Sequence, residues 1–106
     1  MPILTKYEIL ETIKKIRPIY EKDGLVLLGL FGSYARDEAT ENSDVDLLYD
    51  VDNLFLEKYR GFRSVSKVLE IQNELSAVFN TRVDLTSPSG LSQNIKDDIV
   101  SKAIYV

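Results

Sequence analysis

The chain has 106 residues, of which 44% are hydrophobic and 28% are charged, so we expect residues 1–106 to form one domain with a modest core. The formal net charge of −4 argues against a protein that coats nucleic acid, because such proteins present basic surfaces. The sequence contains no cysteine and no histidine, which excludes disulfides, zinc–thiolate sites, thiol nucleophiles and the commonest general base.

The first ten residues, MPILTKYEIL, carry no recognisable targeting signal. They lack the basic segment and apolar core of a signal peptide. No apolar run in the chain approaches the ~18 residues of a membrane-spanning helix. We therefore expect a cytoplasmic protein without a membrane partner.

A helix is predicted near the start of the chain. Thr5 and Glu8 stand at the spacing of a capping box, in which each side chain bonds the other residue's backbone amide. Proline cannot donate the helical hydrogen bond, so Pro18 should kink or end this helix near Arg17. The apolar face of the helix is formed by Ile9, Ile13, Ile16 and Tyr20.

Two strands are predicted in the middle of the chain. Residues 25–31 form a continuous apolar run bounded by glycines, and the length of this run favours a buried strand. After a polar loop, residues 44–51 alternate between polar and apolar. Side chains two apart on a strand point the same way, so Asp44 and Asp46 should share one face.

The second half of the chain predicts helix, strand and helix. Residues 54–79 have helical periodicity, with a break or a late helix start at Gly61. Residues 82–86 form a third strand, and residues 91–102 form a last helix before an apolar tail. This order predicts an α/β (α+β) fold with a small mixed sheet flanked by helices. The apolar stripe of the long helical segment is formed by Phe62, Val65, Leu69, Leu75 and Phe79.

The turn after the first strand has the features of a phosphate site. Gly32 lets backbone amides approach a ligand closely, and Ser33 adds a hydroxyl at the start of a short helix. Arg36 can reach the same anion with a permanently charged guanidinium. Taken alone, a Gly-Ser after a strand is usually only a turn.

Three carboxylates supply the second half of a candidate site. Asp44 and Asp46, facing one point, suit Mg²⁺, which prefers oxygen ligands and is often held by one or two carboxylates and substrate phosphates. If the third strand lies beside the second, Asp84 completes an acidic trio and can bind a metal or accept a proton from a hydroxyl. The ordinary alternatives are a solvated strand start for the first two and an edge-strand charge for the third.

At these residues the sequence resembles the minimal nucleotidyltransferase (MNT) family of the DNA polymerase beta superfamily. The resemblance covers essentially the whole chain. It implies a nucleotidyltransferase fold in which a hydroxyl attacks the α-phosphate of ATP and pyrophosphate leaves. It also implies that Asp44 and Asp46 hold magnesium, that Gly32 and Ser33 bind the β- and γ-phosphates, and that Asp84 assists the attacking hydroxyl. The family signature of Gly-Ser, a spacer of ten residues and Asp-x-Asp appears here as Gly32-Ser33, residues 34–43 and Asp44-Val45-Asp46.

Chains of this size resemble the antitoxin half of HEPN/MNT toxin–antitoxin pairs. The resemblance implies transfer of AMP from ATP to a tyrosine of the partner HEPN ribonuclease toxin. One departure is Asp37, which stands where many relatives have glycine and adds an acid near the phosphate site. A non-catalytic antitoxin that occludes the toxin is therefore an alternative. A small-molecule or RNA nucleotidyltransferase is a third and weaker one.

Two other groups of residues allow several interpretations. Lys58, Arg60 and Arg63 can face a nucleotide or a partner, although a charged helix start is usually only solvated. Tyr34 and Tyr49 flank the candidate site and can stack on a base, with a core position as the alternative for Tyr49.

Overall fold

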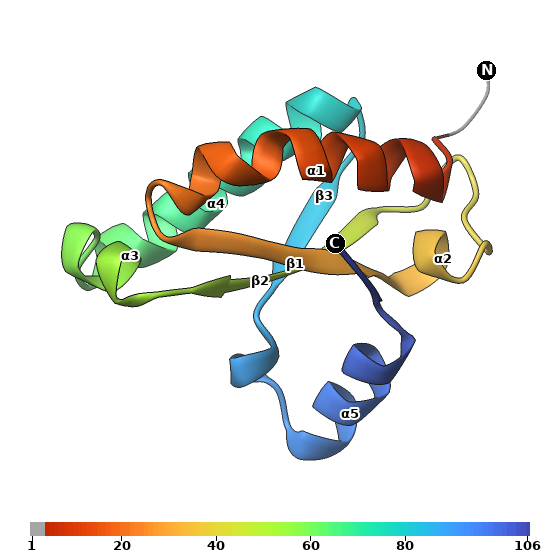
Figure 1. Ribbon diagram of the computed structural model, residues 1–106. Helices are drawn as coiled ribbons and strands as arrows, with labels where there is room; N and C mark the ends of the chain where they lie inside the picture. Colours follow the sequence, from red (N-terminus) through yellow and green to blue (C-terminus); the bar gives the residue numbers. More distant parts are fainter. Residues whose placement is uncertain (1–3) are drawn as a thin grey trace.

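A four-stranded mixed sheet forms the centre of the molecule, seen in a computed structural model that describes residues 4–106 (Figure 1). β1 pairs antiparallel with both β2 and β4, and β2 pairs parallel with β3. This arrangement confirms the predicted small mixed sheet. In spatial order the strands are β3 (Val83–Thr86), β2 (Val45–Val51), β1 (Leu25–Phe31) and β4 (Ile104–Tyr105).

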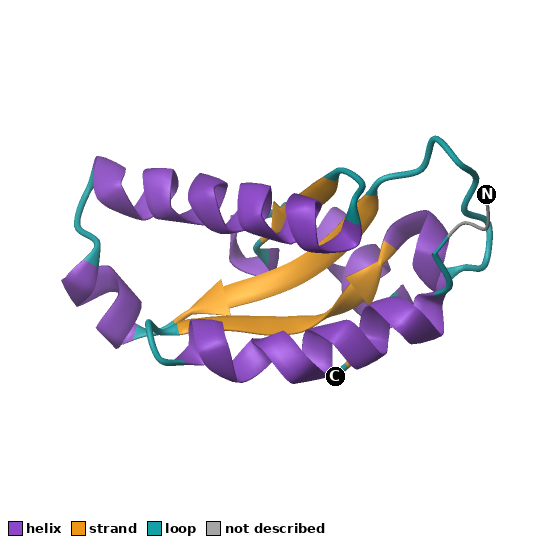
Figure 2. Cartoon of the chain, turned by 90° about the horizontal axis from the view of Figure 1, so that it is seen from above, coloured by secondary structure: helices purple, strands orange, loops and turns teal. Residues whose placement is uncertain are grey.

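Two long helices cover one face of this sheet, and a third helix lies on the other side. α1 (Lys6–Glu21) and α4 (Phe62–Phe79) lie over the same face, whereas α5 (Gln93–Lys102) is on the opposite side (Figures 1 and 2). No helix within residues 4–106 is long and apolar enough to cross a membrane. The short helical elements are α2 (Gly32–Ala35), α3 (Asn53–Lys58) and the 3-10 turn η1 (Pro88–Gly90).

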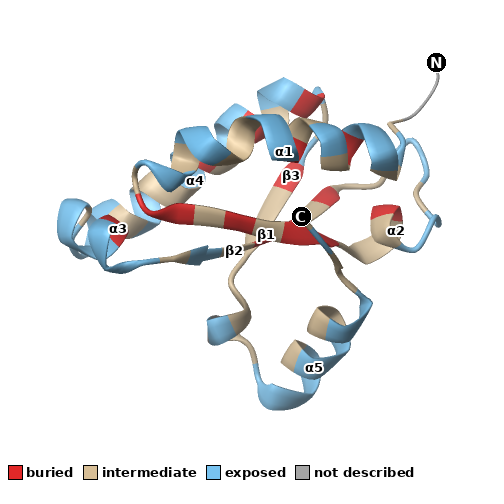
Figure 3. Cartoon of the chain, in the orientation of Figure 1, coloured by how far each residue is buried: buried red, intermediate tan, exposed pale blue. Residues whose placement is uncertain are grey.

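The core lies between the sheet and the layer of α1 and α4. Buried side chains follow β1 and the helix faces that are turned toward it (Figure 3). Every second residue of β2 faces the helices, as strand alternation requires, whereas an irregularity between Leu27 and Gly29 shifts this pattern in β1. The fully buried members of this cluster include Ile9, Ile13, Leu25, Leu30, Val45, Leu47, Ile71, Leu75 and Val83.

The first helix has the predicted cap but not the predicted end. The backbone amide of Glu8 donates to Thr5 Oγ1 at 3.2 Å, which confirms Thr5 as the N-cap, and the Thr5 hydroxyl lies 3.3 Å from Glu8 Oε1. The helix continues through Pro18 to Glu21, so of the two predicted effects of Pro18, a kink or an end near Arg17, the end is excluded. Tertiary packing compensates for the missing hydrogen bond, because Tyr20 packs against the core and its hydroxyl donates to Glu74 of α4 at 3.0 Å.

The predicted apolar tail is in fact the edge strand β4. It pairs with β1 at Gly29 and Leu30, and the amide of Val106 donates to the carbonyl of Leu28 at 3.0 Å. A Cβ at Gly29 would collide with the carbonyl oxygen of Ile104, so only glycine lets the two backbones approach this closely. A two-residue strand has too short a pattern to be recognised from sequence.

The long helical segment divides in two, and its apolar stripe is only half covered. α3 ends at Lys58 and α4 begins after Gly61, which confirms the predicted break. Toward the end of α4, Leu75 and Phe79 are buried in the core. The exposed members of the stripe are Phe62 at 91%, Val65 at 58% and Leu69 at 52% exposure.

Side chains of α4 cover the outer edge of β3. The amide of Val83 donates to Ser76 Oγ at 3.0 Å, and the amide of Leu85 donates to Gln72 Oε1 at 2.9 Å. These are the strand's outward-facing donors, because β2 occupies the other side of β3. The helix therefore takes the place of a further strand.

Replacing Gln72 with leucine should destabilise the protein by about 1–3 kcal/mol, since it leaves the partly buried amide of Leu85 without an acceptor. Gln72→Glu keeps an acceptor oxygen at the same reach and should recover most of the loss. Urea unfolding of the two variants measures the difference. Equal stability of both would contradict a role for this hydrogen bond.

Candidate functional site

The parallel pairing of β2 and β3 brings two of the predicted carboxylates together. Asp46 is the register partner of Asp84, and Val45 is the partner of Val83. Both valines are fully buried under the helices, so the two aspartates point to the opposite face of the sheet, the side of α5. The condition set by the sequence, that the third strand lie beside the second, is thus met.

Asp46 is a half-buried carboxylate in an acidic environment. Burial, followed by the charges of Asp84 and Asp44, raises its pKa from 3.8 to about 6, although the charge of Arg36 acts in the opposite direction. No hydrogen bond from a described group offsets this effect. The three predicted acids therefore form one electrostatic cluster, with Asp46 at its most buried position.

Gly32 holds the start of α2 directly against this cluster. Phe31 pairs with Asp46 across the sheet, and the chain then turns through Gly32 at a φ of +76°. A Cβ at this position would collide with the carboxylate of Asp46. Glycine is required both by the backbone conformation and by the close approach. The first amides of α2 and the Ser33 hydroxyl consequently lie at the same end of β1 as the carboxylate, and no side chain caps this helix.

Arg36 lies at the end of α2, close enough to influence Asp46. Its Nε is 3.2 Å from Glu38 Oε2, and its side chain is 47% exposed. The positive charge opposes the rise in the pKa of Asp46. A role for Arg36 on a phosphate stays a prediction.

Sequence reasoning missed Arg82. Its Nε is 3.5 Å from Asp84 Oδ1 and 3.9 Å from Asp44 Oδ2, with the side chain 72% exposed. The available signal was its position two residues before Asp84, which places both side chains on the same face of the chain. Arg82 is the counter-charge of the acidic cluster at its exposed rim, whereas Asp46 lies deeper.

The cluster suits a divalent cation through its charge and its oxygen ligands. Within residues 4–106, no three Asp, Glu, His or Cys side chains are already gathered into a metal-binding group. Magnesium does not need such a group, because one or two carboxylates and the phosphates of a substrate commonly complete its coordination. The uncompensated charge at Asp46 is what a cation would neutralise.

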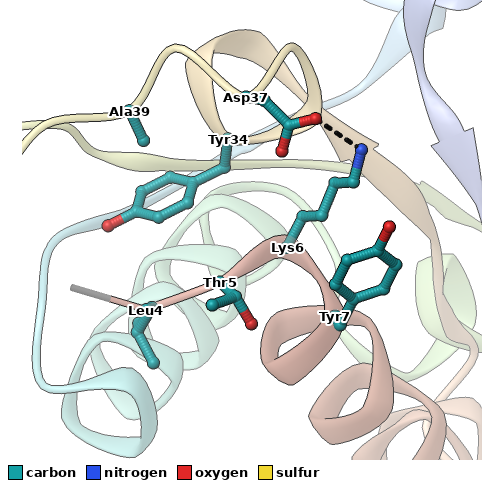
Figure 4. A pocket seen from close by; sticks show the side chains of 7 residues that line it. All are labelled: Leu4, Thr5, Lys6, Tyr7, Tyr34, Asp37 and Ala39. Atoms are coloured by element: carbon teal, nitrogen blue, oxygen red, sulfur yellow. Dashed lines mark hydrogen bonds and ion pairs between the residues drawn. The ribbon is translucent and has the colours of Figure 1, made fainter. Parts of the chain in front are cut away.

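Asp37 is turned away from this cluster, toward the start of α1. Its backbone is left-handed, with a φ of 58°, directly after α2. Its carboxylate accepts a hydrogen bond from Lys6 Nζ at 2.7 Å across a pocket of about 260 Å³, and this bond raises the pKa of Lys6 (Figure 4). The position favours glycine for conformational reasons. The acid that was expected near the phosphate site is thus paired with a lysine.

Neither tyrosine beside the motif is available to stack on a base. Tyr34 is 5% exposed and lies in the core cluster between α2 and α1. Tyr49 is on the helix-facing side of β2, where burial raises its pKa. Both side chains therefore belong to the layer opposite the carboxylates, which overturns the stacking interpretation.

The mixed sheet, the glycine turn and the carboxylates of adjacent strands define the nucleotidyltransferase fold. A solved chain provisionally described as a minimal nucleotidyltransferase aligns with a TM-score of 0.72, 24% identity and 97% coverage of both chains. A chain from a crystal structure of a toxin–antitoxin with AMP-PNP aligns with a TM-score of 0.58 and 23% identity, over 96% of this chain and 72% of that one.

Sequence similarity identifies the family. Residues 11–106 match the family described as "Polymerase beta, Nucleotidyltransferase". The protein adenylyltransferase MntA of Thermococcus cleftensis is 34% identical over 102 residues, which cover 92% of this chain and 95% of that protein. The chain therefore belongs to the polymerase beta nucleotidyltransferase family.

The raised pKa of Asp46 predicts a pH-dependent stability. Between its ordinary pKa of 3.8 and its folded value of about 6, the native state keeps a proton that the unfolded chain loses, so stability falls as pH rises through this window. Two pKa units correspond to about 3 kcal/mol, and partial exposure reduces the effect to about 1–2 kcal/mol.

Asp46→Asn should remove that cost. In urea unfolding with a chelator present, the variant should be more stable than the parent protein at pH 7, and the two should converge below about pH 4. A difference that is independent of pH would contradict an ionisation cost at Asp46.

Comparison of Asp37→Ala with Asp37→Gly isolates the cost of the left-handed backbone at residue 37. Both variants lose the hydrogen bond to Lys6, so the ion pair does not contribute to the difference between them. Only glycine relieves the left-handed conformation, which costs other residues about 1–2 kcal/mol. Asp37→Gly should therefore have the higher melting temperature of the two. Identical melting curves would indicate that the strain at residue 37 is negligible.

Proposed function

We propose that this chain is a Mg²⁺-dependent protein adenylyltransferase that transfers AMP from ATP to a tyrosine hydroxyl of a HEPN ribonuclease toxin, and so acts as an antitoxin. The observation that carries the proposal is the pairing of Asp46 with Asp84 beside the Gly32 turn. The chain also spans 95% of a relative named as a protein adenylyltransferase. A toxin–antitoxin structure with a nucleotide analogue shares its fold.

Each residue has a definite role in this proposal. Gly32, Ser33 and Arg36 would bind the β- and γ-phosphates through backbone amides, a hydroxyl and a guanidinium. Asp44 and Asp46 would hold magnesium, which when bound neutralises charge on the phosphates and polarises the α-phosphate.

Asp84 would act at the acceptor. It would contribute to the metal site and accept the proton of the attacking hydroxyl. The new bond joins the tyrosine oxygen to the α-phosphorus, and the bond from that phosphorus to the bridging oxygen breaks. Pyrophosphate leaves with the electron pair, so the acceptor carries AMP and the reaction consumes one ATP. We place this reaction in the cytoplasm, where ATP and the toxin are both available.

The non-catalytic alternative has lost part of its basis. It rested on Asp37 as an acid that would repel a triphosphate, and that carboxylate is paired with Lys6. The net charge of −4 remains compatible with occlusion of a basic ribonuclease. The two functions differ in whether neutralisation of the toxin requires the carboxylates.

Incubation with α-labelled ATP, Mg²⁺ and a cognate HEPN ribonuclease should label that ribonuclease. Asp44→Ala/Asp46→Ala should reduce transfer by about 100-fold or more, because the charge-neutralising site is lost. Asp97→Ala/Asp98→Ala removes two exposed acids of α5 and is the matched control.

The same variants separate the two functions in cells that express the toxin. Loss of growth rescue with Asp44→Ala/Asp46→Ala supports catalysis. Full rescue by that variant, with no transfer by the parent protein, would establish occlusion. Undiminished labelling by the variant would contradict the catalytic assignment itself.

A further inference from the structure

An apolar groove lies between α3, α4 and the sheet, away from the carboxylates. It has a volume of about 250 Å³, and its outer wall is formed by Leu56 of α3 and by Val65 and Leu69 of α4. Its floor consists of apolar side chains that also contact the core, including Val51, Phe55, Val68 and Leu85. The floor is therefore preformed by the packing of the domain, whereas the wall is exposed.

The exposed wall continues along the helix as a stripe. Phe62, Val65 and Leu69 are spaced by three and four residues, which puts them on one face of α4. Phe62 is 91% exposed, and Leu56 across the groove is 52% exposed. A preformed groove beside an exposed stripe of this spacing is the form in which proteins receive an amphipathic helix.

The segment that connects α3 to α4, at one end of this groove, is basic, although the chain as a whole is acidic. Residues 57–67 contain Lys58, Arg60, Arg63 and Lys67 against Glu57 alone, in a chain with a net charge of −4. Lys58 is paired with Asp23, and Lys67 with Glu70. Within residues 4–106, Arg60 and Arg63 are exposed and make no ion pair. A partner segment would complement this connecting segment with acidic side chains.

We propose that this groove, which we call the α3–α4 groove, docks an amphipathic helix of the protein acceptor. The docked helix has an apolar face against Phe62, Val65 and Leu69 and acidic residues against Arg60 and Arg63. The inference rests on the proposed function only in taking the acceptor to be a protein. The apolar floor favours a helix over RNA, which would require phosphate contacts along the surface.

Docking and chemistry would use separate surfaces. α3 lies at one end of the sheet and α2 at the other (Figure 1), and the groove is on the helix-covered face, whereas Asp46 and Asp84 point to the opposite face. Loss of docking should therefore weaken binding of the acceptor and leave nucleotide binding unchanged. This separation makes the proposal distinguishable from the assignment of the catalytic residues.

Val65→Asp and Val78→Asp form a matched pair, since both valines are exposed on α4, at 58% and 52%. Only Val65 lines the groove. Val65→Asp should weaken the Kd for the purified HEPN protein by at least about tenfold, as expected for a charge in an apolar contact. Val78→Asp should not change it. Thermal stabilisation by AMP-PNP and Mg²⁺ should be the same in both variants, which also controls for folding.

Charge reversal tests the acidic flank of the partner. Arg60→Glu/Arg63→Glu should weaken the same Kd and reduce its salt dependence, whereas Lys14→Glu/Lys15→Glu on α1 makes an equal change in net charge and should not. The double arginine variant should restore binding to a HEPN variant in which the contacting acids have been made basic.

Other outcomes would overturn the proposal in recognisable ways. Equal Kd values for Val65→Asp and Val78→Asp, or no binding of the HEPN protein by the parent chain, would exclude the groove as its docking site. A concentration-dependent dimer that Val65→Asp dissociates would assign the groove to a second copy. Binding of single-stranded RNA that Arg60→Glu/Arg63→Glu abolishes would assign it to nucleic acid. Intact, groove-dependent binding without AMP transfer would instead contradict the catalytic assignment.

Discussion

The parallel pairing of β2 and β3 is the interaction on which the rest of the structure depends. It sets two carboxylates side by side on one face and two fully buried valines on the other. A parallel pair cannot be closed by a tight turn, so the chain must cross over, and α3 and α4 form that crossover. The buried side chains of α4 then pack on the helix-facing side of β2 and β3 and complete the core. Fold and site are thus consequences of one strand register.

This register has an energetic cost that the neighbouring residues partly relieve. Three like charges lie close together, and Asp46 is half removed from water. Arg82 compensates the outer acids at the rim, and Arg36 acts on Asp46 from the end of α2. Neither removes the excess charge at Asp46. A site whose negative charge is not fully neutralised in the free protein retains affinity for a cation, at the expense of stability.

The parts of the fold that could be predicted are those with a long or specific pattern. The two central strands are apolar or alternating runs of seven residues, and the Gly32 to Asp46 motif has a fixed spacing. The place of Asp84 followed from the same alternation once its strand was placed next to β2. Local signals were sufficient here because backbone geometry alone determines where these side chains point.

The missed features depend on tertiary contacts. Pro18 does not end α1, because Tyr20 beyond it is held by the core and by Glu74. The strand β4 can pair with β1 because Gly29 has no side chain to block the backbone of Ile104. A two-residue sequence pattern does not reveal this contact. Tyr34, which was predicted to flank the candidate site, is buried in the hydrophobic core. The apolar stripe of α4 was visible, but its periodicity could not show that the domain covers only one half of it.

The covered edge of β3 restricts how this molecule can be recognised. An exposed edge strand can form backbone hydrogen bonds with a further strand, either from a binding partner or from an aggregating copy. Here the outward amides of β3 are already taken by Ser76 and Gln72, so a foreign strand would first have to displace α4. At the other edge of the sheet, β4 is only two residues long, which is too short to pair stably with a further strand. Recognition along the β3 edge must therefore rely on side chains and surface shape rather than on extension of the sheet.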